Sequence, residues 1–247
     1  MFGKGGEPIL LITGFRTTMD MWDPNLLNRL ASSNHTVIVF DDRGMGKTTV
    51  GTKEFSINRF ANDAAGLLNA LHINNATVLG WSMGGYVAQI LAINYHNKVN
   101  DLIIYASDWS GKEAIYRNST VIQEQGERFL NLLVPAQWLQ ANPDVTNYIP
   151  IPTETSAPSS IQDQAKASDN WSGSCNSISK INKPTLIITG TYDIAVPAVN
   201  SIILAEKIPG SWLIQIKSGG HGLMYQYPKE LSNIILTFHT AEILRYC

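Results

Sequence analysis

The sequence predicts an α/β protein built on a mostly parallel, doubly wound sheet. Six short β-branched and aliphatic runs recur along the 247 residues. Most of them are continuously apolar, which is typical of parallel strands that are buried on both faces. Segments with helical spacing lie between the runs, and this alternation indicates a doubly wound sheet. The predicted strands are Ile9–Thr13, Val37–Phe40, Thr77–Leu79, Leu102–Ala106, Thr185–Thr189 and Trp212–Ile216.

Three helices are predicted between and after these strands. The first has apolar residues at helical spacing from Ile57 to Leu71, and Ser56 stands before it as an N-cap. The same spacing predicts a second helix around residues 87–91 and a last helix around residues 231–238. The sequence contains no internal repeat.

The composition excludes several classes of protein. Hydrophobic residues make up 44% of the chain and charged residues 15%, so a core can form and intrinsic disorder is excluded. The net charge of −2 provides no excess of positive charge that would attract nucleic acid or an anionic membrane. Cys175 and Cys247 cannot build a disulfide framework or a zinc site, and no histidine spacing indicates another metal. Without a membrane-length apolar stretch or a signal-peptide pattern, a cytoplasmic protein is expected.

Residues 110–180 interrupt the alternation of strands and helices. This segment contains helical patterns, including Val121–Val134, and a polar connection from Ile149 to Ser160, but no convincing strand. We therefore expect a helical cap inserted into a core made of residues 1–109 and 181–247. The alternative is a long meandering loop, which is disfavoured because structureless loops of this length are uncommon.

The strongest functional signal is the pattern Gly-x-Ser-x-Gly at residues 80–84, between a predicted strand and a predicted helix. So tight a turn leaves no room for side chains at Gly80 and Gly84, and it forces Ser82 into a strained backbone conformation. The serine hydroxyl is then raised above the end of the strand. This context predicts that Ser82 is a nucleophile, and the alternative is a turn of small residues without a chemical role.

A serine nucleophile needs a base and an acid partner. His221 is the predicted base, because it follows the last strand in a glycine-rich loop. The other histidines, at positions 35, 72, 96 and 239, are expected to be surface or capping residues. Asp193 is the predicted acid, just past a strand end, and Asp108 is its competitor after the preceding strand.

Acyl transfer also places negative charge on a carbonyl oxygen, which requires an oxyanion hole. The backbone amide of Met83 is one predicted donor, since it follows the nucleophile at a helix N-terminus. The amide of Phe15, in the loop after the first strand, is the second, and Gly14 lets the backbone approach closely.

The predicted substrate pocket is lined by Gly14, Trp81, Trp109, Trp138 and Met224. Trp81 flanks the nucleophile, and Met224 follows the predicted base. Aromatic and sulfur-containing side chains suit a small apolar ester or lactone. The alternative for each tryptophan and for the methionine is ordinary core packing.

Together these motifs resemble the α/β-hydrolase fold of serine hydrolases. The chain order Ser82, Asp193, His221 is the order found in that superfamily. Within it the sequence is most similar to small capped esterases, enol-lactonases and cofactor-free haloperoxidases. The resemblance implies hydrolysis of a carboxylic ester or lactone through an acyl-enzyme, without a cofactor. The matching segments are Ile12–Phe15, Phe40–Thr48, Gly80–Gly84, Pro184–Pro197 and Gly220–Gly222.

Other functions stay open at this point. The same catalytic residues would serve a perhydrolase, in which peroxide replaces water, or a carbon–carbon bond hydrolase. A small-molecule receptor on the same fold would keep the residues with little turnover. Ser82 argues against dehalogenase and epoxide hydrolase chemistry, which needs a carboxylate nucleophile. Gly44–Thr48 resembles the end of a phosphate-binding loop, but Asp41 stands where that motif requires glycine.

The sequence departs from the resembled family in two places. Thr13 stands where the family usually has histidine, so the hydrogen bonds of the oxyanion loop are expected to differ. The family usually has an N-terminal β-hairpin before the first strand, but this sequence begins at the glycine-rich turn that would close it. We therefore expect either a fold without the hairpin or a truncated version of the chain. The absence of the hairpin would expose Val37–Phe40 as an apolar sheet edge, which favours a homodimer paired through that edge.

Overall fold

The computed structural model describes residues 1–3, 5–109, 114–115 and 129–244. Six parallel strands form one sheet in the order β2-β1-β3-β4-β5-β6. All six predicted strands are confirmed, with ends that shift by up to three residues. Their bounds are β1 Glu7–Ile12, β2 His35–Val39, β3 Ala76–Trp81, β4 Val99–Tyr105, β5 Thr185–Gly190 and β6 Trp212–Ile216.

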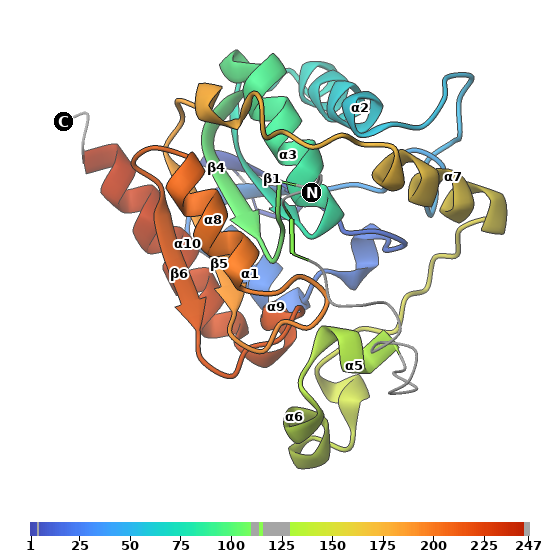
Figure 1. The fold of residues 1–247 in the computed structure, drawn as a ribbon, viewed down its shortest axis with the longest axis vertical. Coiled ribbons are helices and arrows are strands. Elements are labelled where there is room, and N and C mark those ends of the chain that lie inside the picture. The colour runs from blue at the N-terminus through green and yellow to red at the C-terminus, as the bar shows by residue number, and fades with distance from the viewer. Residues whose placement is uncertain (4, 110–113, 116–128, 245–247) are drawn as a thin grey trace.

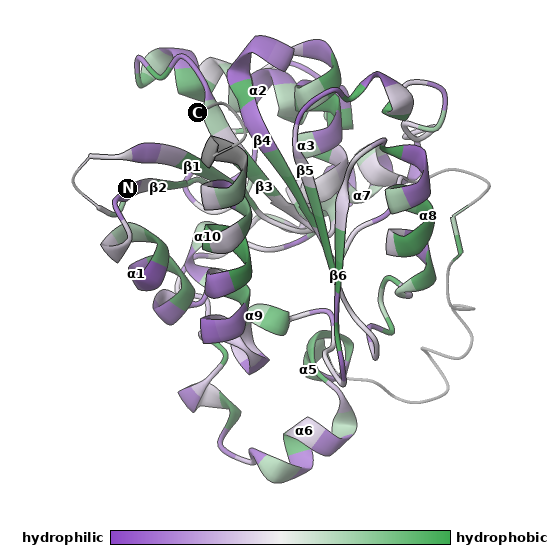
Figure 2. Ribbon diagram, turned by 90° about the vertical axis from the view of Figure 1, so that its left-hand side faces the viewer, coloured by the Kyte–Doolittle hydropathy of each residue, from purple (hydrophilic) through white to green (hydrophobic). Residues whose placement is uncertain are grey.

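Helices cover both faces of the sheet, which explains why the strands are continuously apolar. Leu10 and Ile12 of β1 belong to one core cluster, and Ile9 and Leu11 of the same strand belong to the other. Because successive side chains of a strand point to opposite faces, neighbouring positions in the buried part of a strand are both apolar. Figure 2 shows α1 and α10 on one side of the strands and α8 on the other. The helices of this core are α1 Pro24–Ser32, α2 Ile57–Ala70, α3 Met83–Asn94, α8 Val199–Lys207, α9 Leu223–Gln226 and α10 Pro228–Leu244.

The predicted first helix is α2, and its N-cap is confirmed. The Ser56 hydroxyl oxygen accepts a hydrogen bond from the amide of Arg59 at 3.1 Å. The other two predicted helices correspond to α3 and α10. By contrast, α1, α8 and α9 were not predicted, although Asp23 caps α1 by accepting from the amide of Leu26 at 2.7 Å.

The described part of residues 110–180 contains helices and no strand. Its helices are α5 (Phe129–Leu133), α6 (Ala136–Ala141) and α7 (Pro158–Asp169). The predicted helix Val121–Val134 is described only from residue 129, and the rest of it lies outside the described residues. In Figure 1, α5 and α6 lie beyond the ends to which the arrows of β5 and β6 point. These helices therefore lie beyond the carboxyl ends of the strands, where the predicted site residues are located.

The edge strand β2 is partly covered by the beginning of the chain. Phe2 forms an antiparallel bridge with Val37, in which each residue's amide donates to the other's carbonyl oxygen at 2.9 Å. The edge position of β2 agrees with the sequence analysis, but the edge is not open along its whole length. Homodimer formation through the remaining edge stays a prediction.

Candidate active site

Ser82 occupies a strained turn between β3 and α3. Its φ of 56° and ψ of −123° lie in a region that residues with side chains rarely adopt. The flanking glycines are required, because a Cβ at Gly80 would lie 2.2 Å from the Gly84 oxygen and one at Gly84 would lie 2.3 Å from the Ile12 oxygen. The Ser82 side chain is partly exposed at the carboxyl end of the sheet, as expected for a nucleophile.

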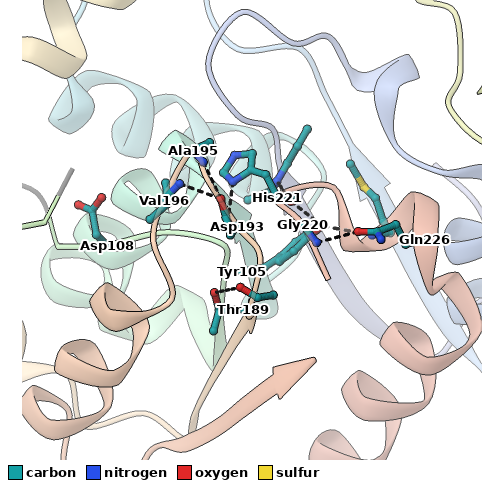
Figure 3. A network of polar contacts seen from close by, with 12 residues as sticks. Tyr105, Asp108, Thr189, Asp193, Ala195, Val196, Gly220, His221 and Gln226 are labelled. Atoms are coloured by element: carbon teal, nitrogen blue, oxygen red, sulfur yellow. Dashed lines mark hydrogen bonds and ion pairs between the residues drawn. The ribbon is translucent and has the colours of Figure 1, made fainter. Parts of the chain in front are cut away.

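Asp193 and His221 form a buried hydrogen-bonded pair (Figure 3). The distance from His221 Nδ1 to Asp193 Oδ2 is 2.9 Å, and the aspartate side chain is fully buried. The other carboxylate oxygen, Oδ1, accepts from the amides of Ala195 and Val196 at 2.9 and 2.8 Å. These amides fix the carboxylate in the orientation that meets the imidazole, so the pair is rigid before any substrate binds.

The competing carboxylate, Asp108, makes other contacts. It is fully buried, its Oδ2 accepts from the Tyr86 hydroxyl at 3.2 Å, and its carbonyl oxygen accepts from Gln89 Nε2 at 2.8 Å. Figure 3 shows Asp108 separated from the Asp193–His221 pair. The carboxylate that meets His221 is therefore that of Asp193.

The backbone of His221 is anchored by two residues of the sheet. Its carbonyl oxygen accepts from Trp81 Nε1 at 3.1 Å and from the Tyr105 hydroxyl at 3.0 Å. Burial raises the pKa of Tyr105 well above its ordinary value, so the hydroxyl remains a donor. The neighbouring amide of Gly220 donates to Gln226 Oε1 at 2.7 Å. Neither Tyr105 nor Gln226 was predicted from the sequence to belong to the site.

Trp81 connects the histidine loop to the nucleophile. The Trp81 and His221 rings lie 5.6 Å apart between centroids, and Ser82 is the next residue along the chain. His221 is thus packed beside the residue that precedes the nucleophile. Among the hydrogen bonds of the described residues there is none between the Ser82 hydroxyl and His221. Such bonds often form only when a substrate completes the site.

The loop after β1 lies against the nucleophile. A Cβ at Gly14 would lie 3.2 Å from the Ser82 Cβ, so glycine permits the close approach expected of an oxyanion loop. The Thr17 hydroxyl donates to the Gly14 carbonyl oxygen at 2.8 Å and stabilises the turn. On the other side of the serine, Met83 is the first residue of α3, so its amide has no acceptor within the helix. Thr13, which departs from the resembled family, is buried, and its hydroxyl has no hydrogen-bond partner in the described part of the chain.

A largely apolar cavity of about 580 Å³ adjoins the oxyanion loop. Its wall is formed by residues 16–18 and 21 of the core and by the 110–180 segment, including Phe129, Leu130 and Ile149. The five predicted pocket residues do not line it. Trp81, Trp109 and Met224 are at most 1% exposed and pack in the core, while Trp138 packs against Tyr148 with ring centroids 5.1 Å apart. Gly14 instead faces the nucleophile.

Two of the histidines expected at the surface are buried. His35 and His239 are 6% and 8% exposed, with ring centroids 5.0 Å apart. His239 Nδ1 lies 3.0 Å from Asp101 Oδ2, and this hydrogen bond raises the pKa of His239. Burial lowers the pKa of His35. Both lie at the opposite end of the sheet from His221, because His35 and Asp101 stand at the beginnings of β2 and β4.

Within the described residues, no group of three or more His, Cys, Asp or Glu side chains could hold a metal ion. In the same part of the chain, no helix combines the length and apolar character that a membrane crossing requires.

A carboxyl group is buried in the loop that follows β2. Asp42 is 2% exposed, and its Oδ2 has no hydrogen-bond partner among the described residues. Burial, together with the charges of Asp63 and Asp41, raises its pKa to about 7. The folded state therefore holds a proton that the unfolded state releases near pH 4, so stability falls as pH rises from about 4 to 7. We expect Asp42→Asn to raise the free energy of unfolding at pH 8 by up to about 4 kcal/mol, with little effect at pH 4.

Urea unfolding of wild type and Asp42→Asn at pH 4 and pH 8 measures this difference. An equal change in stability at the two pH values would contradict the prediction. Arg43→Gln is a useful comparison, because it removes the neighbouring ion pair with Asp63, at 2.6 Å, without removing the buried carboxyl group.

The chain belongs to the α/β hydrolase-fold family, whose model matches residues 7–131. It is 23% identical to the serine hydrolase BPHL of Mus musculus, over 96% of this chain and 80% of that protein. It is also 23% identical to 3-oxoadipate enol-lactonase 2 of Acinetobacter baylyi, over 95% of this chain and 89% of that protein. A thermophilic esterase from Thermogutta terrifontis, solved with malate bound, has the same fold with a TM-score of 0.82 and 24% identity, over 97% of this chain and 91% of that one. The predicted fold and family are confirmed.

Proposed function

We propose that this protein is a serine hydrolase that cleaves a carboxylic ester or lactone through an acyl-enzyme intermediate. The main support is the buried hydrogen bond between Asp193 and His221, at the carboxyl ends of the strands, where the strained turn also places Ser82. The relatives that are named hydrolases and lactonases support the same class of reaction.

In the proposed reaction, Ser82 Oγ attacks the acyl carbon while His221 Nε2 accepts the hydroxyl proton. Asp193 orients the imidazole and stabilises its positive charge. The amides of Phe15 and Met83 donate to the developing oxyanion. The bond from the acyl carbon to the leaving oxygen then breaks, and this oxygen takes the proton from His221. Water repeats the sequence on the acyl-enzyme, releasing the acid and restoring Ser82.

The cavity beside the oxyanion loop supports a substrate with an apolar part. Its walls are mostly aliphatic and aromatic, and its volume of about 580 Å³ is in the range of small-ligand pockets. An acyl chain that starts at Ser82 would enter this space past residues 16–18.

The proposal is tested by reacting the protein with a fluorophosphonate and by measuring hydrolysis of p-nitrophenyl acetate, butyrate and octanoate. We expect covalent labelling at Ser82, found by peptide mass spectrometry, and steady turnover of at least one ester. Labelling without steady turnover would favour a receptor on the same fold. A folded protein that is neither labelled nor active would overturn the proposal.

The proposal includes a cytoplasmic location and a homodimer paired through the β2 edge. The apolar strand supports the dimer, since Phe2 occupies only the part of the edge at Val37. Sedimentation velocity over a hundredfold range of concentration should show a monomer–dimer equilibrium. A monomer at every concentration would count against the dimer.

A further inference from the structure

The loop that carries the proposed oxyanion donor Phe15 is not held by the burial of its side chains. The side chain of Phe15 is 39% exposed, and Arg16 is exposed as well. Arg16 also has a φ of 62°, in the left-handed region that residues with side chains rarely adopt. A donor amide stabilises an oxyanion only when it is already held in the right direction, so other contacts must hold this loop.

Thr17 holds the peptide group that contains the donor. The Gly14 carbonyl oxygen accepts from the Thr17 hydroxyl at 2.8 Å and from the Thr17 amide at 3.4 Å. This carbonyl and the Phe15 N–H belong to one planar trans peptide group, so they point in opposite directions. The two hydrogen bonds to the carbonyl oxygen therefore also restrict the direction of the Phe15 amide.

The next peptide group of the loop is held by α7, from the 110–180 segment. The amide of Arg16 donates to Gln164 Oε1 at 2.7 Å, across 148 positions of the sequence. This hydrogen bond restricts rotation about the bond between Cα and the carbonyl carbon of Phe15, and it supports the strained conformation at Arg16. Phe15 thus lies between two peptide groups that are each held by hydrogen bonds.

Packing alone does not explain a glutamine at position 164. Its side chain is fully buried, and its Nε2 has no hydrogen-bond partner among the described residues. A buried amide with an unpaired donor costs free energy that an apolar side chain would not. The other buried residues of α7 are Ser160 and Ala167, and Ala167 belongs to one of the core clusters. The cost at Gln164 is explained if its oxygen has a task in the site.

We infer that Gln164 is a positioning residue, whose side-chain oxygen holds the Arg16 amide and thereby keeps the Phe15 amide directed at the oxyanion. Gln164 acts through the loop and does not touch the substrate. The oxyanion hole is then complete only while α7 is packed on the core. Ile161 of the same helix lines the cavity, so the cavity wall and the oxyanion hole depend on one helix. This inference rests on the proposed hydrolase function of the site.

The kinetic test uses Gln164→Met, which removes the acceptor oxygen and keeps the length of the side chain. Negative charge on the acyl oxygen develops only in the transition state, so KM for p-nitrophenyl butyrate should change little. We expect kcat to fall by about 10- to 100-fold, less than the loss of a whole donor would cause. Gln164→Glu, which keeps an acceptor oxygen in place, should retain most of the wild-type kcat. Gln162→Met is the matched control, since it makes the same change at an exposed position of α7 and should keep wild-type rates.

A pair of inhibitors distinguishes a positioning role from a merely structural one. In a trifluoromethyl ketone with a hexyl chain, the Ser82 oxygen bonds to the carbonyl carbon, the serine proton moves to His221, and the carbonyl oxygen becomes an oxyanion. The corresponding methyl ketone binds without this charge. In Gln164→Met we expect the Ki of the trifluoromethyl ketone to rise by the same factor by which kcat falls, and the Ki of the methyl ketone to stay unchanged. Equal weakening of both inhibitors would overturn the inference, because Gln164 would then affect only the shape of the site.

Hydrogen exchange separates this inference from the proposed function, since it needs no activity. By NMR, the Arg16 amide should exchange about tenfold or more faster in Gln164→Met than in wild type. The Leu26 amide, which donates to Asp23, should exchange at the same rate in both proteins. Faster exchange at Arg16 would support the contact even if no ester is hydrolysed, which would be a failure of the proposed function alone. Unchanged exchange at Arg16, or an unchanged kcat in an active enzyme, would overturn the role of Gln164 and leave the hydrolase proposal intact.

Discussion

Ser82→Ala is expected to lower kcat/KM for p-nitrophenyl esters by about 10⁴-fold or more. The substitution removes the only atom that we propose forms a bond with the acyl carbon, and it leaves the oxyanion donors and the histidine in place. Steady-state and single-turnover kinetics measure the loss. Fluorophosphonate labelling should disappear together with the activity.

Two controls separate loss of chemistry from loss of structure. Ser82→Ala should keep the circular dichroism spectrum and the unfolding midpoint of wild type, because alanine has the same Cβ and leaves the backbone strain of the turn unchanged. Ser33→Ala is the matched control, since its hydroxyl donates to the Arg29 carbonyl oxygen at an exposed helix end. A folded Ser82→Ala protein that retains a tenth of the wild-type activity would contradict Ser82 as the nucleophile.

Most of the fold could be predicted because burial on both faces leaves a clear pattern. The strands contribute apolar side chains to the core clusters on both faces of the sheet, and α2 carries both an apolar face and a serine cap. The helix α1 was missed although Asp23 and Pro24 give it a cap and a proline at its first position, which are recognised signals. For α8 the signal is weaker, because its N-cap residue Ala198 makes no side-chain hydrogen bond.

In the candidate site, residues with a local sequence signal could be predicted, and residues that act through long-range contacts could not. Ser82 was predictable because strand, glycines and helix adjoin in the sequence. Asp193 was preferred over Asp108 for its place after a strand, but what distinguishes the two in the structure is the contact of Asp193 with His221, 28 positions away. Tyr105 and Gln164 left no local signal, since they reach their partners across 116 and 148 positions.

The cavity could not be predicted from residue type. Tryptophan and methionine suit a pocket and a core equally, and the sequence does not indicate which of the two they enter. In the structure Trp81 is an anchor for the histidine loop, and its indole N–H donates to the His221 carbonyl oxygen at 3.1 Å. The cavity wall comes instead from aliphatic residues of the 110–180 segment, whose packing has no period that a sequence pattern would reveal.

Asp193→Asn is expected to lower kcat by about 10³- to 10⁴-fold while KM changes little. The Asp193 carboxylate is fully buried and lies 2.9 Å from His221 Nδ1. In the proposed mechanism it accepts a hydrogen bond from this nitrogen, so that Nε2 can take the serine proton. The side-chain amide of asparagine would donate to Nδ1, so the imidazole proton would lie on Nε2, and Nε2 could no longer accept the serine proton. Steady-state rates for p-nitrophenyl butyrate from pH 6 to 10 measure the effect, and activity should partly recover at high pH as hydroxide replaces the missing base.

Asp108→Asn is the matched control, because it changes a buried carboxylate at the neighbouring strand end that contacts Tyr86 instead of His221. It should keep wild-type rates, and equal losses in the two variants would mean that buried negative charge in this region, rather than the orientation of the histidine, supports the reaction.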